Sequence, residues 1–126
     1  MLSKQQVDQF HRDGFLLVRA MYSADEVEQI SQWTEDIAAK PETPGKTMKY
    51  FESSRKDDSR NMSRIENFVP YQEGFSELIT RRRMLQAVDD LFGEPSVLFK
   101  DKINFKLPGA DGFKEQQDVQ AGWDDY

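Results

Sequence analysis

The chain has 126 residues, the length of one ordinary domain, and its net charge of -6 argues against a nucleic-acid partner, because phosphate binding requires a basic surface. The absence of cysteine excludes disulfides, zinc–thiolate sites and thiol catalysis, and it fits a reducing compartment. No apolar run reaches membrane-spanning length and no signal-peptide pattern opens the chain, so a cytoplasmic protein without membrane contact is predicted.

A first helix is predicted at the start of the chain. Ser3 can cap its N-terminus, and Gly14 is well placed to end it. His11, the single histidine, lies on this helix; with no second ligand two or four positions away, we interpret it as a surface histidine. Residues 15–19, FLLVR, form a short apolar run that predicts a buried strand.

The longest helix is predicted over residues 23–40. Ser23 and Glu26 form a capping box, and Pro41 prevents continuation beyond the last turn. The apolar side chains recur at helical spacing, which predicts a face packed against a sheet: Val27, Ile30, Trp33 and Ile37.

Two extended segments follow, separated by a polar loop. Residues 47–52, TMKYFE, predict a strand, and the mixed-charge stretch 53–61 predicts an exposed loop. Residues 62–68 alternate as a second strand would. Arg64 and Glu66 fall on one side of that strand, where they can form an ion pair on a solvated face.

Helical spacing returns over residues 73–92, with a break near 80–82 and a stop at Gly93. These helices are expected to support a sheet strand that starts at Ser96. Apart from Asp101, one face of that strand is apolar: Val97, Phe99, Ile103, Phe105 and Leu107.

The other face of this strand is polar and positively charged, with Ser96, Lys100, Lys102, Asn104 and Lys106. Three ammonium groups on one face require water or anionic partners. Two interpretations stay open. The face is either the solvated side of an edge strand, or part of it points into a barrel towards an anionic ligand.

The end of the chain resembles a known metal-binding segment. It is similar to the segment found in the phytanoyl-CoA dioxygenase family of iron(II)/2-oxoglutarate oxygenases, in which a loop carries the triplet His-Gln-Asp. In this chain the corresponding run consists of DKINFKLPG, a loop, the triplet Gln116-Gln117-Asp118 and AGWDDY. On a strand, ligands separated by one residue point to the same side and can chelate one ion. The resemblance implies that Asp118 is a metal ligand and that Gln116 stands in place of the family histidine. The family's second histidine and its 2-oxoglutarate arginine would follow Tyr126.

The resemblance also implies an α+β fold, with N-terminal helices packed on the first strands of a double-stranded β-helix, a jelly-roll barrel that this chain would leave incomplete. The chain would be a single partial domain covering the N-terminal half. Residues 1–95 would form a helical flank with short strands, and residues 96–126 the first barrel strands and the metal loop. An exposed barrel edge would favour self-association.

Roles for individual residues follow from the same resemblance. The candidates for binding 2-oxoglutarate are Arg64, Lys102 and Asn104. The candidates for lining the pocket of a small-molecule substrate are Gln117, Trp123 and Tyr126. Ordinary strand packing is the alternative for the two aromatic residues.

The function implied is that of a truncated iron(II)/2-oxoglutarate-dependent dioxygenase that hydroxylates a small organic substrate and is inactive as this chain. The runs KYFE, SRIENF, LFKDKINFK and QDVQAGW resemble the branch that hydroxylates amino-phosphonates such as 2-aminoethylphosphonate. Two alternatives stay open: a non-catalytic module that binds a small anion or another chain, and a decayed gene fragment.

Overall fold

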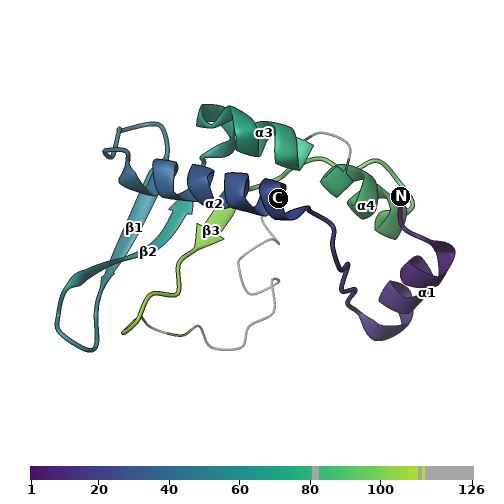
Figure 1. Cartoon of the computed structure of the whole chain (residues 1–126), viewed down its shortest axis with the longest axis horizontal. Helices are drawn as coiled ribbons and strands as arrows, with labels where there is room; N and C mark the ends of the chain where they lie inside the picture. The colour runs from purple at the N-terminus through teal and green to yellow at the C-terminus, as the bar shows by residue number, and fades with distance from the viewer. Residues whose placement is uncertain (81–82, 111, 113–126) are drawn as a thin grey trace, which may run out of the picture.

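A computed structural model gives the fold of the chain and describes residues 1–80, 83–110 and 112. Helices and a small sheet alternate along this part of the chain (Figure 1). The elements are α1 (Lys4–Asp13), α2 (Ala24–Ala39), β1 (Met48–Ser53), β2 (Arg60–Glu66), the 3-10 helix η1 (Val69–Tyr71), α3 (Glu73–Thr80), α4 (Arg83–Phe92) and β3 (Lys102–Asn104).

The first two helices begin with the capping boxes that the sequence predicts. In α1 the Ser3 side chain accepts a hydrogen bond from the Gln6 N–H, and the Gln6 side chain accepts one from the Ser3 N–H. Ser23 and Glu26 repeat this arrangement at α2. Gly14 closes α1 with a φ of 77°, which glycine adopts without a steric cost. Local chemistry therefore determines three of these helix ends.

The three strands form one antiparallel sheet in the order β1-β2-β3. Ile65 in the central strand lies opposite Lys49 and Ile103, and a bulge interrupts the β1–β2 register between Tyr50 and Phe51. Helices α2 and α3 cover one face of the sheet (Figure 1). The core lies in this layer and consists of Ile37, Ile65, Phe68, Val69 and Phe75.

Trp33 of α2 belongs to this helix–sheet layer, as its spacing predicts. Its ring meets Phe75 edge to face at 5.7 Å and lies close to the backbone of α3 at Gly74. A Cβ added at Gly74 would come within 2.3 Å of the Trp33 ring. Glycine is therefore needed at this position, since any side chain would push the two helices apart.

Asp101, the polar residue on the apolar side of the predicted strand, is buried and has a structural role. Its carboxylate accepts hydrogen bonds from the backbone N–H groups of Phe68 at 3.2 Å and Val69 at 2.8 Å. These N–H groups lie at the start of η1. The contact ties the segment before β3 to the turn that follows β2.

Two of the strand predictions were wrong. Residues 15–19 form no strand, and Phe15 and Leu17 are each 63% exposed. The strand expected from Ser96 is limited to β3, Lys102–Asn104. A strand requires a hydrogen-bonded neighbour, and β2 pairs with β3 only through residues 64–66. Within β3 the predicted alternation holds, because Ile103 faces the core while Lys102 and Asn104 are exposed.

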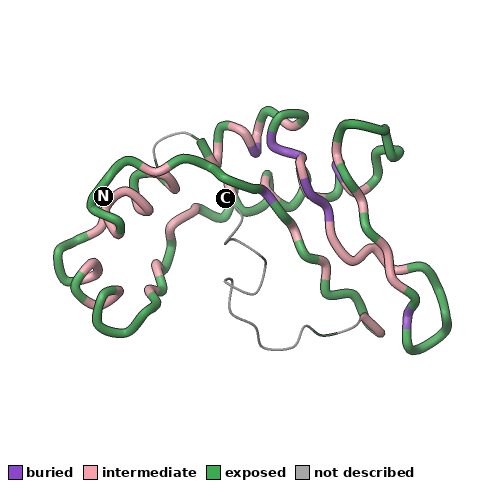
Figure 2. The backbone as a smooth tube through the Cα atoms, turned by 180° about the vertical axis from the view of Figure 1, so that it is seen from behind, coloured by how far each residue is buried: buried purple, intermediate pink, exposed green. Residues whose placement is uncertain are grey.

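Burial is concentrated around β2, η1 and α3 (Figure 2). Helices α1 and α4 pack on each other at the opposite end of the molecule and contain no buried residue. No helix in the described part of the chain combines the length and the apolar character needed to cross a membrane.

Candidate functional site

The sheet face opposite α2 and α3 carries a group of charged side chains. Ile65 points towards the helices, so its neighbours Arg64 and Glu66 point to the other side. The antiparallel register places Asn104 opposite Arg64 and Lys102 opposite Glu66. Directly paired residues share a face. The three residues predicted to bind 2-oxoglutarate, Arg64, Lys102 and Asn104, therefore lie together.

We call this surface the charged face and define it by Arg64, Glu66, Lys100, Lys102 and Asn104. Glu66 lies at its centre and is only 4% exposed. One carboxylate oxygen is 2.8 Å from Nε of Arg64, and the other is 3.2 Å from Nζ of Lys100. The predicted ion pair of Arg64 and Glu66 is thus confirmed. The expectation that this ion pair lies on a solvated face was wrong, because the Glu66 carboxylate is buried.

The Arg64 guanidinium also contacts an aromatic ring. Its central carbon lies 4.0 Å from the ring centroid of Tyr50, which is paired with Arg64 across β1 and β2. This is the geometry of a cation–π contact. The Arg64 side chain nevertheless remains about one-third exposed. A restrained and partly exposed guanidinium can bind a carboxylate or a phosphonate through two parallel hydrogen bonds.

A cavity of about 310 Å³ adjoins the charged face. Glu66 and Lys100 form part of its wall, and the apolar part of the wall includes Met48, Leu98 and Phe99. This volume lies at the lower end of the range of small-molecule sites. Arg64, Lys102 and Asn104 are not among its lining residues, so this cavity lies beside the candidate anion-binding residues and does not contain them.

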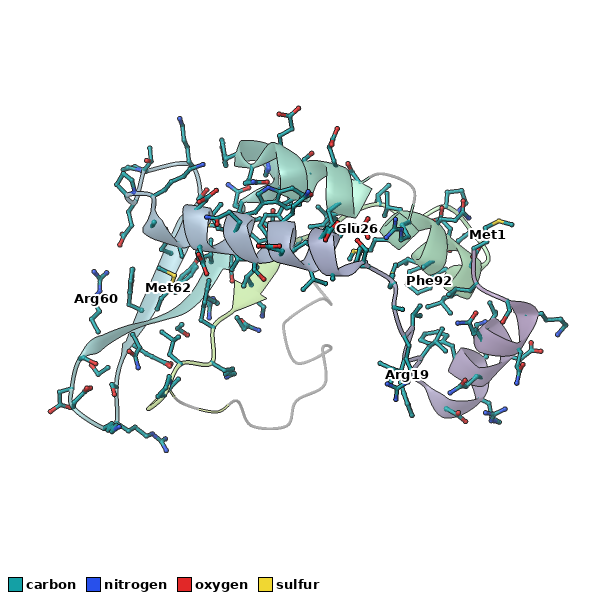
Figure 3. The ribbon with its side chains drawn as sticks, viewed as in Figure 1. Met1, Arg19, Glu26, Arg60, Met62 and Phe92 are labelled. Atoms are coloured by element: carbon teal, nitrogen blue, oxygen red, sulfur yellow. The ribbon has the colours of Figure 1, made fainter. Side chains whose placement is uncertain are left out.

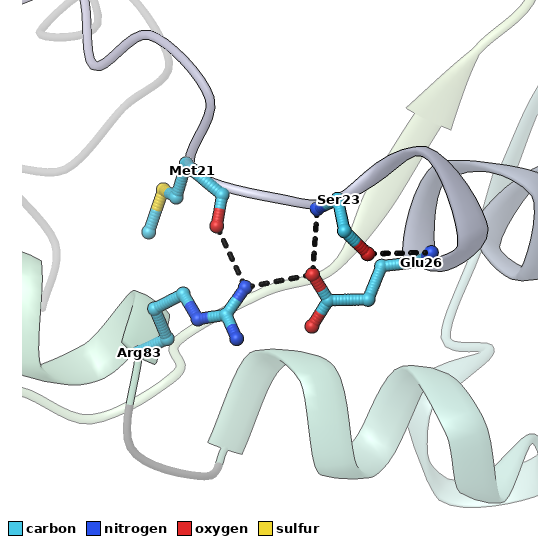
Figure 4. Close-up of polar contacts among 4 residues, drawn as sticks. All are labelled: Met21, Ser23, Glu26 and Arg83. Atoms are coloured by element: carbon cyan, nitrogen blue, oxygen red, sulfur yellow. Dashed lines mark hydrogen bonds and ion pairs between the residues drawn. The ribbon is translucent and has the colours of Figure 1, made fainter.

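A second polar cluster joins the starts of α2 and α4 (Figure 4). Nη1 of Arg83 donates hydrogen bonds to the carbonyl oxygen of Met21 at 2.6 Å and to Oε2 of Glu26 at 2.9 Å. Hydrogen bonds from Arg83 and from the Ser23 N–H lower the pKa of Glu26 to about 2. A carboxylate held ionised in this way is a poor general acid or base near neutral pH. We therefore assign this cluster to helix capping.

The described residues do not provide a metal site. Among them, no group of three or more histidine, cysteine, aspartate and glutamate side chains could hold a metal ion. His11 is exposed on α1, where its ring meets Phe10 at 5.6 Å. The predicted metal residues Gln116 and Asp118, and the predicted pocket residues Gln117, Trp123 and Tyr126, lie outside the described residues.

Figure 3 shows side chains at the two ends of the molecule. Arg60 and Met62 mark the sheet end, whereas Met1, Arg19 and Phe92 mark the end formed by α1 and α4. The charged face belongs to the sheet end. Sequence reasoning named three of its members as candidate ligands and predicted the pairing of Arg64 with Glu66, but it did not predict that Glu66 is buried or that it also contacts Lys100.

Residues 10–122 match the phytanoyl-CoA dioxygenase family. The chain is 37% identical over 119 residues to a 2-aminoethylphosphonate dioxygenase from the uncultured bacterium HF130_AEPn_1; the match covers 94% of the chain and 45% of that protein. A methylphosphonate hydroxylase from Gimesia maris is 30% identical over 120 residues, which are 95% of the chain and 45% of that protein.

The third relative, the dioxygenase lolE1 from Epichloe uncinata, is 25% identical over 113 residues, with 88% of the chain and 43% of the relative covered. No solved structure gives a significant match. The chain therefore spans just under half the length of the curated relatives that it matches.

Proposed function

Because the chain belongs to the phytanoyl-CoA dioxygenase family, we propose that it supplies the anion-binding sheet face of an iron(II)/2-oxoglutarate-dependent dioxygenase that hydroxylates a small organic substrate. The observation that supports this proposal is the grouping of Arg64, Lys102 and Asn104 on one face by the β2–β3 register. The relatives' names, two dioxygenases and a hydroxylase, agree with an oxygenase.

The charge of this face suits a dianion. Arg64, Lys100 and Lys102 bring three positive charges and Glu66 one negative charge, which leaves a net charge of +2. 2-Oxoglutarate carries two carboxylates. Arg64 can bind one of them through a pair of hydrogen bonds, Lys102 adds a point charge, and the Asn104 amide adds a neutral donor.

The position of the helices supports a jelly-roll barrel, with the apolar sheet face turned outwards to α2 and α3 and the charged face turned inwards. In this proposal the chain is one partial domain, with a flank over 1–95 and the first barrel strands and metal loop over 96–126. An exposed barrel edge would favour self-association.

The donor set of the chain does not fit the family's iron site. By resemblance Asp118 would be a ligand, but position 116 is glutamine, and an amide oxygen binds a divalent transition metal more weakly than imidazole does. The single histidine, His11, lies on α1 at the other end of the molecule from the sheet. We therefore expect no hydroxylation by the chain alone. Gln117, Trp123 and Tyr126 stay proposed pocket residues.

For the whole protein we propose a phosphonate as substrate. Two relatives are named for 2-aminoethylphosphonate and methylphosphonate, and a phosphonate dianion would also match a net charge of +2. A cytoplasmic location stays a prediction. The second candidate, a non-catalytic module that binds small anions, is favoured only by glutamine at position 116.

The first test is calorimetric titration of 2-oxoglutarate into the chain and into Arg64→Ala, with Lys56→Ala as a control for the loss of one exposed cation. We expect Arg64→Ala to weaken binding by at least about tenfold, because hydrogen bonds between charged groups contribute about 1.5–3 kcal/mol. Lys56→Ala should leave the affinity unchanged. Equal affinities for the two variants would overturn the proposed role of the charged face.

The second test separates an oxygenase site from a simple anion site. Iron(II) and 2-oxoglutarate are added without oxygen to the chain and to Gln116→His, and the metal-to-ligand charge-transfer absorption is recorded. The oxygenase proposal expects this absorption in Gln116→His and not in the parent chain. Binding of 2-oxoglutarate without the absorption in either protein would favour the non-catalytic module.

A further inference from the structure

We propose that Glu66 is a positioning residue, whose buried carboxylate holds Arg64 and Lys100 in place on the charged face so that Arg64 is ordered before an anionic ligand binds. The inference rests on the proposed function, because it concerns the same anion site. It adds a role for a residue that does not itself contact the ligand.

The burial of Glu66 requires its two partners. The residue is 4% exposed, and a carboxylate removed from water is strongly unfavourable unless it is paired. Its two oxygens contact two different cations, Nε of Arg64 at 2.8 Å and Nζ of Lys100 at 3.2 Å. These cations come from β2 and from the segment that precedes β3. A single carboxylate therefore connects two parts of the face that are distant in the sequence.

The ion pair with Glu66 lies at one particular edge of the Arg64 guanidinium. Nε is buried there, 2.8 Å from the carboxylate but without hydrogen-bond geometry, while the Tyr50 ring lies against the guanidinium at 4.0 Å. Because Glu66 is paired through Nε, the two Nη groups are the donors that the geometry offers to an external carboxylate or phosphonate. A pair of parallel Nη–H donors is the arrangement that such groups bind in a bidentate manner.

Nearby acidic groups do not replace Glu66. Asp101 is its closest acidic neighbour in the β3 segment, but its carboxylate faces the core and binds the N–H groups of Phe68 and Val69. On β1, the residues on the charged face next to Glu66 and Arg64 are Met48 and Tyr50, which are uncharged. Among the described residues, Glu66 is thus the carboxylate that orders this face.

Simple electrostatics and positioning predict opposite results for Glu66→Gln. If Glu66 contributed only its charge, its removal would raise the net charge of the face from +2 to +3 and tighten anion binding. If it orders Arg64, its removal leaves this long side chain to be ordered by the ligand, and binding weakens. The sign of the change in affinity therefore decides between the two explanations.

The experiment compares the 2-oxoglutarate affinities of the full chain, Glu66→Gln and Glu66→Asp by calorimetry. The matched control is Glu28→Gln, which removes an exposed carboxylate from α2. Ordering one long side chain costs a factor of about 2–10 in affinity, so we expect a loss of about that size for Glu66→Gln. Glu66→Asp should recover part of it, and Glu28→Gln should bind as tightly as the parent chain. Equal or tighter binding by Glu66→Gln would overturn the inference.

If the parent chain does not bind 2-oxoglutarate, that result contradicts the proposed function but not the positioning role of Glu66. A second measurement then tests the positioning role without a ligand. The Arg64 Nε–H group is followed by nitrogen-15 NMR and identified by its loss in Arg64→Lys. We expect a shifted, slowly exchanging signal in the parent chain and a signal typical of a mobile arginine in Glu66→Gln. An unchanged signal in Glu66→Gln would overturn the positioning role.

Discussion

The sheet end and the α1–α4 end of the molecule are stabilised in different ways. Around β2, η1 and α3, apolar side chains from three helices and the sheet form a shared core. Where α1 meets α4, neither helix contains a buried residue, and the Leu2 N–H donates a hydrogen bond to Asp90 at 2.5 Å. Phe92 remains 63% exposed there. The charged face is therefore built on the part of the molecule with a packed interior, which is the part able to hold side chains in fixed positions.

The largest expected effect comes from removing a core side chain at the sheet end. Ile65 is fully buried in β2, and Ile65→Ala should lower the free energy of unfolding by about 2–5 kcal/mol. Leu17, exposed in the linker after α1, provides the matched control. Leu17→Ala should change stability by less than about 0.5 kcal/mol in urea denaturation. Similar losses for both variants would show that the two ends do not differ in packing.

An intermediate effect is expected from the buried carboxylate that ties β3 to η1. Asp101→Asn should destabilise the chain by about 1–3 kcal/mol, because it weakens two hydrogen bonds to the Phe68 and Val69 N–H groups. Asp58→Asn is the control: Asp58 is exposed with a φ of 55°, which asparagine adopts as readily. Thermal unfolding monitored by circular dichroism would measure both, and equal midpoints would contradict the structural role of Asp101.

The smallest expected effect depends on pH and concerns the contact between Arg83 and Glu26. Arg83 and the Ser23 N–H lower the pKa of Glu26 to about 2. A carboxylate with a lowered pKa in the folded state stabilises the protein above its unfolded pKa of about 4.3, and this stabilisation disappears as the pH falls towards 2. It should be small, because the pair lies at the surface and salt screens it.

Melting temperatures of the parent chain and Glu26→Gln would measure this effect. Above pH 5 the parent chain should have a higher melting temperature than Glu26→Gln, and this difference should decrease to zero between pH 5 and pH 2. The control is Glu35→Gln, at an exposed position of the same helix, whose difference in melting temperature from the parent should not decrease in this way. A difference that stays constant over this pH range would mean that the ion pair does not stabilise the folded state.

Much of the helical structure could be predicted because its signals are local. The Ser3 and Ser23 caps and Gly14 act within a few residues, so the sequence was sufficient to place both helices. The strands were predicted less well. The apolar run at 15–19 resembles a strand, but strand formation depends on a hydrogen-bonded neighbour that the run itself does not specify.

The candidate site was predicted in part for the same reason. Alternation along one strand placed Lys102 and Asn104 on a common face, and the family resemblance added Arg64. Their juxtaposition required the register between β2 and β3, which no local signal specifies.

The sequence by itself determined the helix caps, the alternation along β2 and β3, and a family resemblance strong enough to identify the candidate anion-binding residues. Only the tertiary structure decided that Glu66 and Asp101 are buried and that they act differently. Asp101 binds backbone N–H groups at η1, whereas Glu66 binds two cations on the opposite face. The physical reason is that the partners of a buried charge come from distant segments, and the fold alone brings them within contact distance.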